Sequence, residues 1–185
     1  DSVILNIDKS FSSPADDAMV KFPLSTVTAQ ENFYGPRRAN LGTLRQSDYV
    51  IRLMNGTIFP GGADPRMKYL FKPAQDGQYR GLETGRGESV LAVTQRPPNH
   101  WGFYTTTSPA AGIDTGARVY FKNNSLFPIL TYSQMQFIKA EAAFKNGDKT
   151  TALAAYKNGI TGSIDHLKQY YTGYIPMSDA DIAAF

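Results

Sequence analysis

The residues best suited to chemistry lie in a stretch rich in glycine, proline and threonine, residues 95–116, which holds the only tryptophan of the chain. Aromatic rings stack on the C–H faces of sugars, while amides and hydroxyls hydrogen-bond with sugar hydroxyl groups. We therefore predict a ligand-binding loop in this stretch, with one further ring upstream. The predicted contacts are Asn99, Trp101, Phe103, Tyr104 and Tyr79.

Two interpretations of Trp101 remain open at this point. A stretch without regular structure that exceeds about 12–15 residues is usually functional or disordered, which favours a ring presented to a ligand. The small hydroxyl residues that follow also favour this, because a buried anchor is usually flanked by aliphatic partners. The alternative is that Trp101 and Phe103 pin the loop to the hydrophobic core.

No motif for a metal, a nucleotide or a catalytic nucleophile accompanies these rings, so we expect no cofactor and no enzyme activity. The chain has no cysteine, which excludes thiolate zinc sites and cysteine nucleophiles. His100 and His166 have no evident partners, and we expect His166 at the surface. A glycoside hydrolase is the alternative, since two carboxylates suffice. Glu83, Glu88 and Asp114 are candidates, but no motif surrounds them.

Composition indicates an ordinary globular protein. Of the 185 residues, 42% are hydrophobic and 19% are charged, which excludes a wholly disordered chain. The net charge is +3, but lysine and arginine are scattered, so we expect no nucleic-acid partner. No apolar run approaches the ~20 residues that span a bilayer.

The dominant element that must position the loop is an antiparallel helical hairpin, predicted at 132–146 and 148–170, of about the length of a tetratricopeptide unit. Apolar residues recur there with helical spacing. Capping signals bound the two helices: Thr131 or Ser133 with Gln134 or Gln136 before the first, Gly147 between them, and Asp148 before the second.

Large and small residues form neighbouring lines on the second helix. We expect the large line, with Leu153 and Ile160, to be buried together with Ile138 of the first helix. Beside it, small residues leave a groove in which a neighbouring helix can approach closely. These small residues are Ala152, Ala155, Gly159 and Ser163.

The remainder of the chain is predicted to contain few regular elements. A short helix is expected at 47–55, and the apolar residues 1–7 are read as a strand or the tail of an earlier element. Asp64 is expected to accept hydrogen bonds from the turn at Pro65, with Arg66 reaching a carboxylate or carbonyl group. Short β-rich runs alternate with loops from residue 68 to residue 121, and we expect an irregular, loop-rich β-hairpin region there. The predicted class is α+β and predominantly helical, with a loop-rich region at 1–125 and a helical-hairpin region at 126–185.

The hairpin resembles a segment of the SusD/RagB-like outer-membrane nutrient-binding proteins, whose pattern is P-L-[LM]-T-Y-A-E-[VL]-x-F-[IL]-x-A-E-A-A followed by A-x-x-x-Y-x-x-[GA]-I-x-x-S. The chain departs from it at Ser133 and Gln134, which replace Ala-Glu. Asp64 to Met67 and Tyr79 to Gly85 resemble two further motifs of the family. The matching hairpin residues are Pro128, Leu130, Thr131, Tyr132, Phe137, Ala140, Glu141, Ala142, Ala143, Ala152, Tyr156, Gly159, Ile160 and Ser163.

This resemblance implies a non-catalytic protein that captures oligosaccharides, or in some branches peptides, at the cell surface. It implies delivery of the ligand to a SusC-like TonB-dependent transporter in the outer membrane. It also implies a lipid anchor on an N-terminal cysteine, which would have to precede residue 1. We therefore expect the chain to be part of a single SusD-like domain, truncated at both ends.

Overall fold

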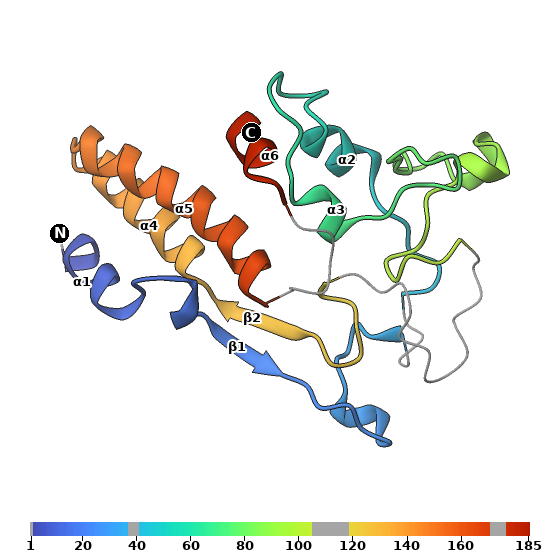
Figure 1. The fold of residues 1–185 in the computed structure, drawn as a ribbon, viewed down its shortest axis with the longest axis horizontal. Helices are drawn as coiled ribbons and strands as arrows, with labels where there is room; N and C mark the ends of the chain where they lie inside the picture. Colours follow the sequence, from blue (N-terminus) through green and yellow to red (C-terminus); the bar gives the residue numbers. More distant parts are fainter. Residues whose placement is uncertain (1, 37–40, 105–118, 171–176) are drawn as a thin grey trace. The chain divides into compact units, whose positions relative to one another are not determined.

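The computed structural model describes residues 2–36, 41–104, 119–170 and 177–185. Helices outweigh strands in these residues, which confirms a predominantly helical α+β chain (Figure 1). The strands β1 and β2 pair in a two-stranded sheet. The elements are α1 (Ser2–Ser10), β1 (Ala18–Lys21), α2 (Asp48–Met54), α3 (Met67–Leu70), β2 (Leu126–Leu130), α4 (Tyr132–Lys145), α5 (Lys149–Tyr170) and α6 (Asp179–Ala184).

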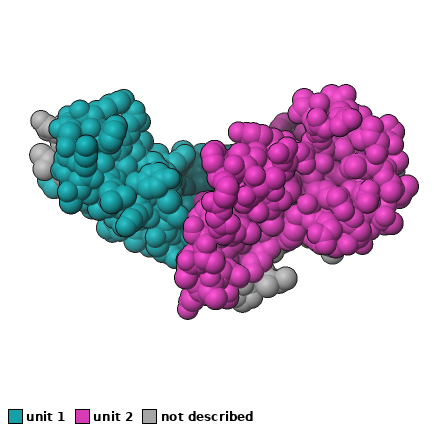
Figure 2. Space-filling view, turned by 90° about the horizontal axis from the view of Figure 1, so that it is seen from above, with its two compact units in different colours: residues 1–20, 126–173 teal, residues 21–125, 174–185 magenta. Residues whose placement is uncertain are grey.

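The chain forms two compact units, coloured separately in Figure 2. Unit 1 combines residues 1–20 with 126–173, and unit 2 combines residues 21–125 with 174–185. One boundary between the units therefore lies between residues 125 and 126. The two terminal segments nevertheless each join the unit formed by the other part of the chain.

The predicted hairpin is present in unit 1 as α4 and α5. The cap of α4 is Thr131, whose hydroxyl accepts from the backbone N–H of Gln134 at 3.2 Å while the Gln134 side chain accepts from the Thr131 N–H at 3.0 Å. Gly147 takes a φ of 81° between the helices, which a residue with a Cβ adopts only with strain. Asp148 then accepts from the N–H of Thr151 at 3.0 Å and begins α5.

Small residues form the contact between α4 and α5. Ser133 donates its hydroxyl hydrogen bond to the Gly159 carbonyl at 2.6 Å, which is possible because the two backbones lie close together. A Cβ at Gly159 would lie only 2.8 Å from the ring of Phe137. The buried residues that line this contact include Ala140, Ala143, Ala152, Ala155 and Gly159.

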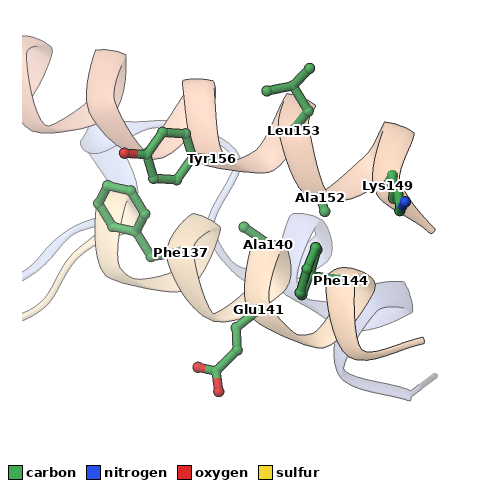
Figure 3. Close-up of a pocket in the computed structure, with 8 residues that line it drawn as sticks. All are labelled: Phe137, Ala140, Glu141, Phe144, Lys149, Ala152, Leu153 and Tyr156. Carbon is green, nitrogen blue, oxygen red and sulfur yellow. The ribbon is translucent and has the colours of Figure 1, made fainter. Parts of the chain in front are cut away.

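The expectation that the large residues would be buried was wrong. Leu153 is 56% exposed, Ile138 is 46% exposed and Ile160 is half-buried. The small line faces α4 because it permits the closer approach, and this turns Leu153 toward solvent, whereas Ile164 and Leu167, farther along α5, are buried. Leu153 borders an open apolar groove of about 580 Å³ between α4 and α5. Figure 3 shows Phe137 of α4 and Tyr156 of α5 facing each other there, with ring centroids 5.7 Å apart.

Residues 2–10 form helix α1, so the predicted strand is wrong. Ile7 is buried, and Asp8 forms an ion pair with Lys139 of α4. Asp8 also accepts from the side-chain amide of Gln136 at 3.1 Å. These contacts lie more than 120 residues apart in sequence, so a reading of residues 1–7 alone had no sign of them.

His166 is buried, which corrects the prediction that it lies at the surface. Its Nδ1 lies 2.5 Å from one carboxylate oxygen of Asp17. The other oxygen of Asp17 accepts from the backbone N–H of Tyr132, in the first turn of α4. Asp17 therefore joins the segment before β1 to the start of α4 and to the C-terminal part of α5.

We expect Asp17→Ala to lower the free energy of unfolding by about 2 kcal/mol or more, because it leaves a buried imidazole and a helix N–H without their acceptor. Helix loss followed by circular dichroism during urea unfolding measures this. Asp48→Ala is the control, since its ion pair with Arg52 is exposed and 3.8 Å long, and it should cost below about 1 kcal/mol. Equal costs for the two variants would contradict the anchoring role.

Unit 2 contains little regular structure, and buried side-chain amides take the place of backbone pairing. Gln46 donates to the carbonyl groups of Lys72 and Arg80 at 3.0 and 2.5 Å. The predicted helix is present as α2, and it ends before Gly56, whose φ is 78°. The β-hairpin expected between residues 68 and 121 does not form in the described residues, where only isolated bridges occur. Its runs are too short, and glycine and proline flank them.

The predicted turn at Asp64 is confirmed. Asp64 accepts from the backbone N–H of Arg66 at 2.9 Å and binds the Arg66 guanidinium through both carboxylate oxygens. The guanidinium lies 5.6 Å from the centre of the Phe185 ring. A Cβ at Gly62 would meet the carbonyl oxygen of Ala184 at 2.0 Å, so α6 packs directly on this turn. The Asp-Pro-Arg motif is therefore structural.

Candidate ligand-binding surface

Two of the predicted contact residues lie in the interior of unit 2. Trp101 has no exposed surface, and its indole N–H donates to the carbonyl of Tyr34 at 2.7 Å. Asn99 is 2% exposed. The expectation of an exposed indole is therefore wrong, and Trp101 has the surroundings of a core anchor. Sequence reasoning left the core alternative open and could not decide for it, because the partner carbonyl lies 67 residues away.

Asn99 shapes the turn that follows it. Its side-chain oxygen accepts from the backbone N–H groups of Trp101 and Phe103, at 3.1 and 3.0 Å. Its amide donates to the carbonyl of Gly42 at 3.3 Å. An asparagine that satisfies its own turn in this way fixes the backbone on which the neighbouring rings stand.

The other three predicted residues are half-buried. The hydroxyl of Tyr104 donates to the carbonyl of Pro73 at 3.0 Å, and the ammonium group of Lys72 lies 4.9 Å from the centre of its ring. Phe103 is the last residue of the Asn99 turn, and Tyr79 follows a separate turn at residues 75–77. Ligand contact by these rings remains a prediction.

A group of four rings, two of them exposed and two half-buried, lies next to the Asn99 turn, and we call it the aromatic surface. It consists of Phe33, Tyr34, His100 and Phe121. Phe33 and Tyr34 meet edge to face at 5.3 Å, and Tyr34 meets Phe121 in the same way at 6.3 Å. His100 stacks on Phe121 at 5.2 Å with an interplanar angle of 28°. Phe33 is 57% exposed and Tyr34 is 36% exposed.

Buried polar contacts hold the aromatic surface in place. The side-chain amide of Asn32 donates to the carbonyls of Tyr120 and Lys122, at 2.8 and 3.0 Å, and its oxygen accepts from the N–H of Tyr34. A Cβ at Gly35 would lie 2.7 Å from the Cα of Asn123, so the turn approaches as closely as only glycine allows. The rings therefore stand on a fixed backbone.

The environment of His100 keeps its ring uncharged near neutral pH. Burial lowers the pKa of His100 below its ordinary value of 6.5, and the positive charge of Arg45 lowers it further. Arg45 itself forms an ion pair with Glu88. A neutral imidazole can both donate and accept a hydrogen bond, which suits a hydroxylated ligand.

The carboxylates considered for catalysis are engaged elsewhere. Glu83 pairs with Arg86 at the surface, at 2.8 Å, and Glu88 pairs with Arg45. Asp114 lies outside the described residues. Within the described ranges, no three acidic or histidine side chains gather in a group able to hold a metal ion. None of the helices described is long and apolar enough to cross a bilayer.

Comparison with known families decides the assignment. The family model SusD-like_2, described as starch-binding and associating with the outer membrane, matches residues 2–184. The chain belongs to this SusD-like family. The match spans both compact units, so the aromatic surface and the helical hairpin are parts of one family region. No curated protein matches the chain.

Sequence reasoning assigned no role to Phe33 and Tyr34 of this SusD-like chain, two adjacent rings that precede Gly35-Pro36. It missed Phe121, which lies in an apolar run that reads as a strand. The useful signal was the pair of adjacent rings before a Gly-Pro turn, because large side chains at a turn are rarely buried.

We expect Trp101→Ala to destabilise unit 2 by about 3–5 kcal/mol, because it opens a cavity and removes the donor to the Tyr34 carbonyl. Trp101→Phe should cost less, about 1–2 kcal/mol, since a ring still fills the site. Urea unfolding of each variant measures the change. Phe59→Ala, at a ring that is 70% exposed, is the control and should be close to neutral. An unchanged stability in Trp101→Ala would contradict a core role.

The lowered pKa of His100 predicts a dependence of stability on pH. The unfolded chain binds a proton near pH 6.5, whereas the folded chain binds it only at lower pH. The stabilising contribution is therefore complete above about pH 6.5 and is lost as the pH falls toward the folded pKa. Urea unfolding at a series of pH values should show this loss in the natural chain and less of it in His100→Gln. Identical profiles would exclude the shift.

Proposed function

We propose that this protein captures oligosaccharides at the cell surface and passes them to a SusC-like TonB-dependent transporter, without catalysing a reaction. The observation that carries the proposal is the aromatic surface of Phe33, Tyr34, His100 and Phe121. The centres of neighbouring rings lie 5.2–6.3 Å apart, and the rings offer several faces for stacking. The family description supports a glucan as the ligand class.

The proposed binding combines stacking on aromatic rings with hydrogen bonds to polar groups. The exposed rings lose little conformational entropy on binding, because Asn32 and Gly35 already fix the backbone that carries them. Sugar C–H faces can stack on Phe33 and Tyr34, and the neutral imidazole of His100 can exchange hydrogen bonds with hydroxyl groups. Phe103, Tyr104 and Tyr79 remain secondary candidates for contact.

The cellular setting forms part of the same proposal. The protein is exposed on the outer face of the outer membrane and held there by a covalently attached lipid. The hairpin of α4 and α5 acts as a tetratricopeptide-like scaffold. Radiolabelled palmitate incorporation by the complete gene product in its native bacterium tests the anchor, and co-purification with a TonB-dependent transporter tests the partner.

We expect the double change Phe33→Ala and Tyr34→Ala to weaken binding of maltoheptaose by about 1–3 kcal/mol while leaving the melting temperature nearly unchanged. Isothermal titration calorimetry and a thermal melt measure the two effects. Phe59→Ala removes a still more exposed ring from another turn of unit 2 and should bind as the natural chain does. Undiminished binding of maltoheptaose by the double variant would contradict the assignment of the aromatic surface as the glycan-binding site.

The same samples separate the two alternative functions. New reducing ends after incubation with maltoheptaose would identify a glycoside hydrolase. Retention of peptides, with no retention of glycans, would identify a peptide-binding member of the family. A binder of the proposed kind retains the glycan and releases it unchanged.

A further inference from the structure

A second hollow lies in unit 1 and is unlike the apolar groove. It has a volume of about 210 Å³, and the turn before residue 14, the start of α4 and the middle of α5 surround it. We call it the polar pocket. The residues that define it are Ser12, Ser13, Tyr132, Asn158, Thr161 and Asp165.

Two walls of the polar pocket are fixed by contacts that do not involve a ligand. Asp16 accepts from the N–H and hydroxyl of Ser12, at 2.7 and 2.8 Å, and from the N–H of Ser13 at 3.0 Å. The Tyr132 ring lies directly on α5, because a Cβ at Gly162 would come within 2.6 Å of its Cδ1. The hydroxyls and the ring therefore have set positions.

The third wall is formed by polar side chains of α5 that make no contact explaining their presence in the described part of the chain. Asn158, Thr161 and Asp165 follow one another at i, i+3 and i+7, so they share a face of α5. Their side chains form no hydrogen bond or ion pair within the described part of the chain. An amide, a hydroxyl and a carboxylate beside an aromatic ring supply both donors and acceptors. This is the chemistry that recognises a sugar ring.

The charge around the pocket narrows the class of sugar. Burial raises the pKa of the Tyr132 hydroxyl, and the negative charges of Asp8 and Asp165 raise it further, while Lys139 acts in the opposite direction. Lys139 is already paired with Asp8. The carboxylate of Asp165, which lines the pocket, therefore disfavours an anionic ligand.

We propose that the polar pocket binds one neutral or amine-bearing sugar residue, as a second glycan site separate from the aromatic surface. Its volume lies below the ~300 Å³ at which pockets for drug-sized ligands begin, so it suits a single residue. The inference extends the proposed glycan function to unit 1. It does not depend on any residue of the aromatic surface.

Amide NMR spectra of the full chain test the two sites separately. Methyl α-D-glucopyranoside and D-glucosamine, at millimolar concentration, should shift the amides of residues 158–165, and D-glucuronate should not. Maltoheptaose should shift the amides of Phe33, Tyr34 and Phe121 if the aromatic surface binds. Shifts at only one set of amides would support that site and reject the other.

Variants of α5 sharpen the test. Asn158→Ala and Thr161→Val should each weaken binding of the glucoside by about fivefold or more, through loss of a hydrogen bond. Gln169→Ala, at an exposed polar position of the same helix, is the matched control and should leave it unchanged. Asp165→Asn should admit glucuronate. Absent shifts at residues 158–165 with both neutral and amine-bearing sugars, or equal shifts with glucuronate, would overturn the proposal.

Discussion

Unit 2 depends on one constraint, which is that buried backbone carbonyls need partners even where no helix or sheet supplies them. Side-chain amides meet this need. Asn32, Gln46 and Asn99 are each at most 3% exposed, and each donates to carbonyls of distant segments. Trp101 does the same with its indole. The irregular chain is therefore as closely specified as a sheet, but by individual residues.

This way of building has a functional benefit. A sheet would present its side chains in a regular alternation, whereas turns fixed by amides can bring rings from separate segments together. Phe33, His100 and Phe121 come from three such segments and still form one surface. The helical unit uses the opposite approach, because a line of small residues sets the distance between α4 and α5 and leaves the outer face open to carry other contacts.

Sequence reasoning succeeded where structure is local. The caps at Thr131 and Asp148, the stop at Gly147 and the turn at Asp64 all depend on residues within four positions of each other. It failed where the deciding partner is remote.

The buried state of His166 depends on Asp17, 149 residues away, and that of Trp101 on the Tyr34 carbonyl, 67 residues away. The prediction of which face of α5 packs against α4 was wrong for a related reason. Hydrophobicity picks out the large residues Leu153 and Ile138, but the approach distance of the partner helix favours the small ones. Family resemblance identified the protein class, and it did not indicate which rings are exposed.

The burial of the only tryptophan has a spectroscopic consequence. Indole emission from the folded chain comes from unit 2 alone, and in a fully buried site it should lie at short wavelength. Far-ultraviolet circular dichroism comes mainly from the long helices α4 and α5 of unit 1. The two optical signals therefore follow different units, and coincident transitions would show that both units unfold as one cooperative body.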